Sequence, residues 1–137
     1  MKPNFRILVI DDEKIVCDRL SMELERAGFE VEAFSESAQA LQRISAQPFD
    51  LVITDIKMRG PNGIEIMNFI RENYRSTRVI VITGFATVDT ARQVLAGGAV
   101  EFIPKPFKIS QLREVVQRLA AEKAGEGHFH ERDGKEK

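Results

Sequence analysis

The chain has 137 residues, of which 43% are hydrophobic and 30% charged, and its formal net charge is −1. This length and composition are typical of one globular domain with a short extension. The balanced charge argues against general attraction to nucleic acid or to acidic membranes, and no apolar run approaches the length of a membrane span. The single cysteine, Cys17, cannot form an internal disulfide, so we expect a packed thiol and a cytoplasmic protein.

The first half of the chain alternates between strand and helix patterns. Residues 5–10 form an apolar run and predict a first strand, and an amphipathic helix follows and ends at Gly28. Residues 30–34 alternate polar and apolar side chains, which predicts a strand nearer the sheet edge. Ser35 or Ser37 is expected to cap a second helix. Residues 50–54 are then typical of a strand that is buried on both faces, and this strand ends at Asp55.

The second half repeats the alternation. Glycine, proline and asparagine at positions 60–63 predict a loop, and a third helix is expected from residue 64 to about residue 74. The apolar run 79–82 predicts a strand that ends at Thr83, and Thr87 is expected to cap a fourth helix whose inner face includes Val94 and Leu95. A last strand over residues 101–103 leads into a helix with a regular apolar stripe from Ile109 to Leu119.

Five strand–helix units in succession predict an α/β fold. Right-handed crossovers place such strands in a five-stranded parallel, doubly wound sheet with helices on both faces. The predicted domain covers residues 1–121. Residues 122–137 are rich in Glu, Lys, Gly and His, and they are expected to form a disordered tail or a truncated linker.

Polar residues follow four of the five predicted strands, namely Asp11 and Asp12, Asp55, Thr83, and Lys105. The carboxyl ends of parallel strands meet at one edge, so these side chains are expected to converge. Three close carboxylates repel one another, and Mg²⁺ relieves that repulsion through oxygen ligands. With Lys105 and Thr83 to hold phosphoryl oxygens and Asp55 as the nucleophile, the set predicts phosphoryl transfer. Each residue taken alone could equally be a helix cap, a backbone partner or a surface lysine.

These motifs, in this order and spacing, resemble the receiver domain of bacterial two-component response regulators over roughly residues 5–119. The resemblance implies a flavodoxin-like fold with strand order 2-1-3-4-5. It also implies that Asp55 accepts a phosphoryl group from a phosphohistidine on a sensor histidine kinase or phosphotransfer protein. Asp12 and Asp55 would bind Mg²⁺ directly, Asp11 partly through water, and the backbone carbonyl of Lys57 would be a further ligand. Phe102 matches the switch aromatic of the family, which turns inward when Thr83 is drawn to the phosphate.

Three finer expectations follow from the residues and the resemblance. The Lys105–Pro106 bond is predicted to be cis, because a tight reversal follows the strand. Lys57 and Phe85 are predicted to flank the approach of water to the phosphoryl group and so to slow its loss. The fourth helix, last strand and last helix are predicted to form the output surface, with these polar candidates: Arg92, Gln93, Arg113 and Gln117.

The favoured function is a signalling switch that catalyses only its own phosphotransfer and dephosphorylation and is not otherwise an enzyme. Its partners are expected to be proteins, with no direct binding of nucleic acid or membrane, and the chain is expected to be a monomer or a phosphorylation-dependent dimer. The chain could also be the receiver fragment of a larger transcriptional regulator. A flavodoxin-like electron carrier is a less favoured function, because Asp11-Asp12-Glu13 stands where a phosphate loop is needed. An aspartyl-phosphate phosphatase is less favoured as well.

Overall fold

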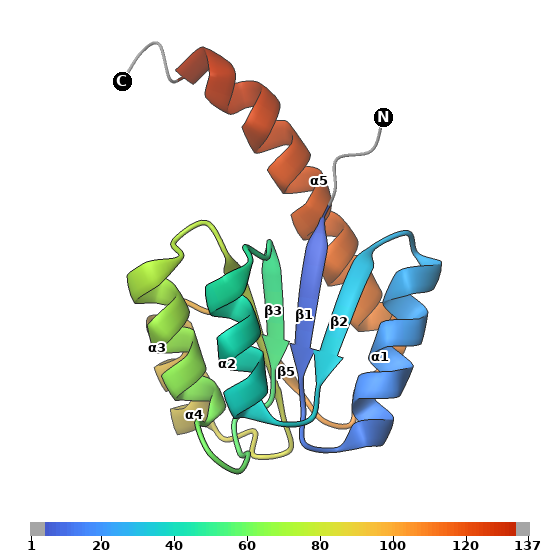
Figure 1. Cartoon of the computed structure of the whole chain (residues 1–137), viewed down its shortest axis with the longest axis vertical. Helices are drawn as coiled ribbons and strands as arrows, with labels where there is room; N and C mark the ends of the chain where they lie inside the picture. Colours follow the sequence, from blue (N-terminus) through green and yellow to red (C-terminus); the bar gives the residue numbers. More distant parts are fainter. Residues whose placement is uncertain (1–4, 134–137) are drawn as a thin grey trace.

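The structure is a computed structural model that describes residues 5–133, with side chains described for residues 5–125. Five parallel strands lie in the order β2-β1-β3-β4-β5 and helices cover both faces, which confirms the predicted fold class (Figure 1). The strands are β1 (Arg6–Ile10), β2 (Glu30–Phe34), β3 (Leu51–Thr54), β4 (Arg78–Thr83) and β5 (Glu101–Pro104). The helices are α1 (Lys14–Arg26), α2 (Ser37–Ala46), α3 (Gly63–Asn73), α4 (Val88–Ala96) and α5 (Ile109–Asp133).

The sheet separates two hydrophobic clusters, because successive strand residues point to opposite faces. In β1, Ile7 and Val9 pack with the residues of α1 and α5, whereas Leu8 and Ile10 pack with α2, α3 and α4. Cys17 is buried in the first of these clusters, as expected of a packed thiol. Because both faces of the central strands are covered, these strands need continuous apolar sequences.

Strand register brings the strand ends together. Ile10 of β1 pairs with Thr54 of β3, so the residues that follow them, Asp11 and Asp55, leave neighbouring strands at the same level. The Asp55 amide donates to the carbonyl oxygen of Ile10 at 3.0 Å, which continues the ladder by one bond. The edge of the sheet therefore places the two acids side by side.

Two helices differ in detail from the sequence prediction. At α2 the N-cap is Glu36, and its side chain makes no capping bond. Ser37 is buried instead, and its hydroxyl donates to the carbonyl oxygen of Arg59 at 2.8 Å, which ties α2 to the loop after β3. In α4, Thr87 is the predicted cap and accepts from the Thr90 amide at 3.0 Å, but Leu95 is 49% exposed. The prediction that Leu95 faces inward was wrong, because only the side of α4 that carries Val94 meets the sheet.

The last helix continues beyond the predicted end of the domain at residue 121. Within α5 the buried stripe ends at Leu119, but helical backbone extends to Asp133 (Figure 1). Alanine, glutamate and lysine, which dominate residues 120–124, favour helix without any packing partner. Glu122 also pairs with Arg78 at 3.3 Å. Helical backbone is thus assigned up to residue 133, and residues 134–137 lie outside the described part. A disordered tail or truncated linker over residues 122–137 stays a prediction.

None of the helices in the described part of the chain is both long and apolar enough to cross a membrane.

Candidate functional site

Asp55 lies directly after β3, and the surrounding backbone fixes its position. The residue is 7% exposed, and its Oδ1 accepts a hydrogen bond from the Ile56 amide at 2.6 Å. The Thr54 hydroxyl donates to the carbonyl oxygen of Asp55 at 2.8 Å. Gly63, the first residue of α3, packs so closely that a Cβ atom there would lie 2.1 Å from the same carbonyl oxygen. A residue without a side chain is therefore required where α3 begins.

Asp11, Asp12 and Asp55 form an acid cluster in which each residue offers a carboxylate oxygen within 4.8 Å of the others. Asp11 is fully buried, and its Oδ1 accepts from the Glu13 amide at 2.9 Å. Its Oδ2 is also buried and, apart from an ion-pair contact with Lys105, has no hydrogen-bond partner among the described residues. Burial raises the pKa of Asp11 and the nearby Asp55 charge adds to this, although contact with Lys105 works in the opposite direction. The buried Oδ2 of Asp11 therefore depends on a cation, and not on a hydrogen-bond donor of the backbone, to stabilise its charge.

The Lys105 ammonium supplies the positive charge of this site. Its Nζ lies 2.8 Å from Oδ2 of Asp11, 2.9 Å from Oδ2 of Asp55 and 3.0 Å from Oε1 of Glu13. Burial alone lowers the pKa of Lys105, but the contacts with the three carboxylates outweigh burial and raise it. The Lys105–Pro106 bond is cis, as predicted. Lys105 is therefore held as a cation over the acid cluster.

Thr83 ends β4 on the other side of Asp55, and it is fully buried. Its Oγ1 accepts a hydrogen bond from the Phe85 amide at 3.0 Å, while its carbonyl oxygen accepts from the Lys105 amide at 2.8 Å. Phe102, on the neighbouring strand β5, is half-buried and packs against the cluster that includes Val94 of α4. The two residues predicted to form the switch thus lie on adjacent strands at the α4 side of the sheet.

Lys57 and Phe85 are in contact with each other. The Lys57 ammonium lies 3.8 Å from the centroid of the Phe85 ring, a cation–π geometry, and Phe85 is 51% exposed. The sequence predicted that both residues flank the approach to Asp55, but it gave no sign that they pair.

Glu13 also belongs to this site, through its contact with Lys105, although no functional role is predicted for it from the sequence. The sequence does contain a signal for it, because a third acid directly follows the Asp11-Asp12 pair. That spacing alone reads equally well as the start of a helix. Its contact with Lys105 joins residues 92 positions apart, and only the fold brings these together.

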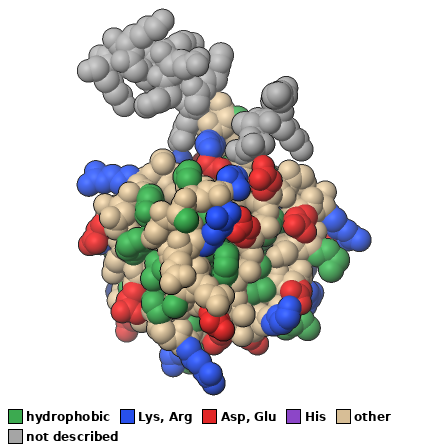
Figure 2. Space-filling model, viewed as in Figure 1, with side chains coloured by type: hydrophobic (Ala, Val, Ile, Leu, Met, Phe, Trp, Pro, Cys, Tyr) green, Lys and Arg blue, Asp and Glu red, His purple; other side chains and the backbone are tan. Residues whose placement is uncertain are grey.

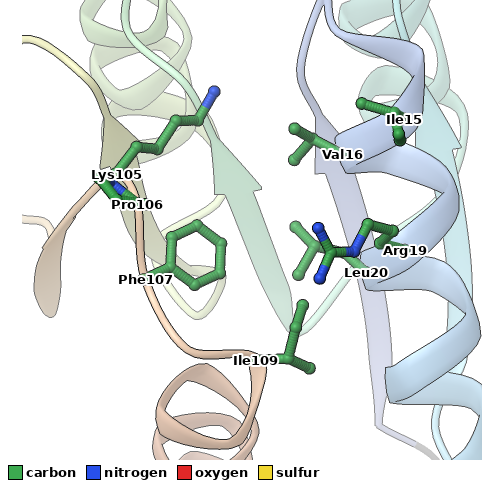
Figure 3. Close-up of a pocket in the computed structure, with 8 residues that line it drawn as sticks. All are labelled: Ile15, Val16, Arg19, Leu20, Lys105, Pro106, Phe107 and Ile109. Atoms are coloured by element: carbon green, nitrogen blue, oxygen red, sulfur yellow. The ribbon is translucent and has the colours of Figure 1, made fainter.

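An apolar groove of about 380 Å³ adjoins the site between α1 and the loop that follows β5. Figure 3 shows Phe107 pointing from that loop toward α1, where Leu20 and Arg19 face it. Ile15, which also lines the groove, is among the most exposed large apolar residues of the described chain. The groove therefore offers an apolar surface next to Lys105, with Arg19 as a nearby positive charge.

On the face seen in Figure 2, acidic and basic side chains are interspersed over the coloured surface. This mixed pattern agrees with the formal net charge of −1.

Comparison with known proteins finds bacterial regulatory proteins as relatives. Response regulator protein PilR of Pseudomonas aeruginosa is 31% identical over 111 residues, which cover 81% of this chain and 25% of PilR. The chain thus spans about a quarter of the length of that relative.

Solved structures share the fold. A CheY-like response regulator receiver domain protein from Methanospirillum hungatei has a TM-score of 0.85 at 28% identity, covering 90% of this chain and 99% of that one. Response regulator protein TrrA from Thermotoga maritima, solved in complex with Mg²⁺–BeF, has a TM-score of 0.75 at 32% identity, covering 84% of this chain and 98% of that one. The sequence pattern of the response regulator receiver domain matches residues 7–117. This chain therefore belongs to the receiver domain family of response regulators.

Proposed function

We propose that this chain is a phosphorylation-dependent signalling switch in which Asp55 accepts a phosphoryl group from a sensor histidine kinase or a phosphotransfer protein. The observation that carries this proposal is the convergence of three aspartates and the Lys105 ammonium at one edge of the sheet. A fixed carboxylate beside positive charge can attack phosphorus and form an acyl phosphate.

The transfer step uses residues that are already in place. A carboxylate oxygen of Asp55 donates an electron pair to phosphorus, and the bond from phosphorus to the donor imidazole nitrogen breaks, with its electron pair going to that nitrogen. Lys105 contacts Asp55 at 2.9 Å, so its ammonium is within reach of the oxygens of the transferred group. The Thr83 hydroxyl can donate to another of these oxygens. The chain then acts only on its own phosphoryl group, which water later removes.

The acid cluster fits Mg²⁺. Its donors are carboxylate oxygens, which hard divalent cations prefer, and the buried Oδ2 of Asp11 has no hydrogen-bond partner among the described residues beyond its ion-pair contact with Lys105. In this proposal Asp11, Asp12, Asp55 and the backbone carbonyl of Lys57 hold the ion. When bound, it neutralises charge on the phosphoryl oxygens. The Mg²⁺–BeF complex of the relative TrrA supports this choice of metal.

The groove between α1 and the loop after β5 is the proposed docking surface for the phosphodonor protein. It combines exposed apolar side chains with a position next to Lys105. A partner that brings a phosphohistidine to Asp55 has to contact the rim of the site, and an exposed apolar patch rimmed by charge is typical of such contact surfaces.

The proposed output surface is formed by α4, β5 and α5, because Thr83 and Phe102 adjoin it. Arg92 and Gln93 of α4 and Gln117 of α5 are exposed. Arg113, the other sequence candidate, pairs instead with Glu23 of α1 at 3.1 Å. Its place on the output surface is therefore not supported, because that face of α5 is turned toward α1.

The chain covers only 25% of PilR and 26% of a second relative, transcriptional regulatory protein ZraR of Klebsiella oxytoca, which supports the alternative that it is the receiver part of a larger transcriptional regulator. We also propose that the chain acts on a downstream protein partner and lies in the cytoplasm. Its assembly is proposed to be a monomer or a phosphorylation-dependent dimer. The electron carrier and the phosphatase receive no support, since the chain belongs to the receiver family.

The proposal is tested by incubating the protein with acetyl phosphate and Mg²⁺ and measuring its intact mass. We expect the addition of one phosphoryl group, which chelation of Mg²⁺ suppresses and Asp55→Asn abolishes. Asp18→Asn, at an exposed acid on α1 that is not a member of the cluster, is the matched control and should be labelled like the wild type. Equal labelling of Asp55→Asn would contradict the assignment of Asp55.

A further inference from the structure

The Lys105 ammonium contacts three carboxylates, of which two belong to the acid cluster and one does not. The contacts to Asp11 and Asp55 measure 2.8 and 2.9 Å, and both acids are proposed metal ligands. The third contact, at 3.0 Å, is to Glu13, whose carboxylate lies outside that cluster. Lys105 is thus shared between the proposed metal site and a side chain at its rim.

The local structure of α1 does not account for the position of the Glu13 side chain. Glu13 is the N-cap residue of α1, a position at which a side-chain oxygen often accepts a backbone amide, yet it makes no such bond. Its backbone amide donates to Oδ1 of Asp11, so the residue is anchored beside the cluster while its side chain stays 60% exposed. The contact that the Glu13 carboxylate does make is with Lys105.

A divalent cation and the Lys105 ammonium compete for the same carboxylates. Two cations within a few ångströms repel each other, so binding of Mg²⁺ requires the ammonium to give up at least one contact with Asp11 or Asp55. A partly buried ammonium that loses its partners is unfavourable unless another acceptor takes their place. Glu13 is such an acceptor, because it already touches Lys105 and is not needed by the metal.

We propose that Glu13 is a positioning residue that retains Lys105 at the rim of the acid cluster when Mg²⁺ binds. Glu13 thereby raises the Mg²⁺ affinity in two ways, through its own attraction for the ion and through its contact with Lys105. It also keeps the ammonium within reach of the phosphoryl group. This inference rests on the proposed function, in which the cluster binds Mg²⁺.

The test is a double-mutant cycle in which calorimetry measures the Mg²⁺ affinity of the whole chain. Glu13→Gln is made in the wild type and in the Lys105→Met variant, and circular dichroism checks that each protein is folded. With Lys105 present, Glu13→Gln should weaken Mg²⁺ binding by about tenfold, the size expected for one lost charge-assisted contact. In the Lys105→Met background, Glu13→Gln removes only the direct attraction between the Glu13 carboxylate and Mg²⁺. The loss of Mg²⁺ affinity should therefore be clearly smaller than tenfold. Asp18→Asn, another exposed acid near this end of α1, should leave the affinity unchanged.

An equal or larger effect of Glu13→Gln in the Lys105→Met background would overturn this inference alone, since Glu13 would then act without Lys105. Tighter Mg²⁺ binding by Glu13→Gln would overturn it as well, because Glu13 would then hold Lys105 in the competing position. If the wild type binds no Mg²⁺, the metal part of the proposed function fails together with the inference.

Discussion

Lys57 and Phe85, which are predicted to flank the approach of water to a phosphorylated Asp55, contact each other. The ammonium lies 3.8 Å from the ring centroid, so the two side chains support each other. An exposed cation–π contact contributes about 0.5–1 kcal/mol. Neither side chain carries an acid or amide that would orient an attacking water. We therefore predict that this pair shields the phosphoryl group from water and does not assist its hydrolysis.

We expect Lys57→Asn and Phe85→Glu to speed the loss of the phosphoryl group, because each opens the contact and introduces a group that can orient water. The expected change is on the order of tenfold, below the roughly 10²- to 10⁴-fold contribution of a fully positioned general base. The measurement is the decay of phosphorylated protein followed by intact mass after removal of the donor. Lys108→Asn, at an exposed position in the loop after β5, is the control. Decay that stays the same or becomes slower in both variants would refute the shielding role.

Gly63 limits how α3 begins beside Asp55. A methyl group at this position would lie 2.1 Å from the carbonyl oxygen of Asp55 and 2.9 Å from the Cα atom of Ile56, and both are backbone atoms that cannot turn aside. We expect Gly63→Ala to lower the free energy of unfolding by about 1–3 kcal/mol, as overpacked sites do. It should also slow phosphorylation of Asp55, since α3 and the acceptor have to move apart.

Urea unfolding of Gly63→Ala checks this expectation, with Gly84→Ala as the control. A Cβ atom on Gly84 would meet no atom within 4 Å, so that variant should be close to the wild type in stability. Equal stabilities of the two variants would show that the close packing of Gly63 against the backbone of Asp55 does not require a glycine.

At the scale of elements, the alternation of strands and helices was predictable because both faces of the sheet are buried. Continuous apolar runs then identify β1, β3 and β4, and one apolar stripe identifies each helix. Finer features depended on contacts that no local pattern contains. Ser37 is buried with its hydroxyl bonded to the distant carbonyl oxygen of Arg59, and Leu95 is exposed because only the Val94 side of α4 meets the sheet.

The site followed the same division. Asp11, Asp55, Thr83 and Lys105 could be found from their places at strand ends, since parallel strands carry their carboxyl ends to one edge. The contacts of Glu13 with Lys105 and of Lys57 with Phe85 could not, because they depend on rotamers of long side chains across loops.

Among the residues whose side chains are described, the part of α5 after Leu119 contacts the rest of the domain through Ala120 and through surface ion pairs. Beyond the buried stripe, Glu122 pairs with Arg78 and Lys123 with Asp50, and these side chains are partly exposed. Such pairs contribute about 0–1 kcal/mol each. We therefore expect removal of residues 121–137 to lower the free energy of unfolding by about 1 kcal/mol and to leave phosphorylation of Asp55 unchanged. Urea unfolding and intact mass measure the two effects, and a loss above about 3 kcal/mol would show that the extension is part of the fold.

At the scale of the whole molecule, one edge of the sheet concentrates buried negative charge, and this links stability to pH and to metal. Burial, together with the charge of Asp55, raises the pKa of Asp11 above its ordinary value of 3.8. A carboxyl whose pKa is higher in the folded than in the unfolded state favours folding when protonated. That contribution is complete below the ordinary aspartate pKa and is lost as the pH rises through the raised value. Above the raised value, the buried charge of Asp11 lowers the stability of the metal-free fold.

Asp11→Asn keeps the shape of this side chain and removes its ionisation. In metal-free buffer at pH 7 we expect the variant to have the higher Tm, by a few degrees, since about 1 kcal/mol shifts the Tm of a domain of this size by roughly 3–5 °C. Well below pH 3.8 the difference should shrink, because Asp11 is then protonated in both the folded and the unfolded wild type. Added Mg²⁺ should raise the Tm of the wild type more than that of Asp11→Asn, since the variant lacks one anionic ligand. A variant that is less stable than the wild type at pH 7 would mean that the ion pair of Asp11 with Lys105 outweighs the burial of its charge, and that Lys105 alone already satisfies the acid cluster.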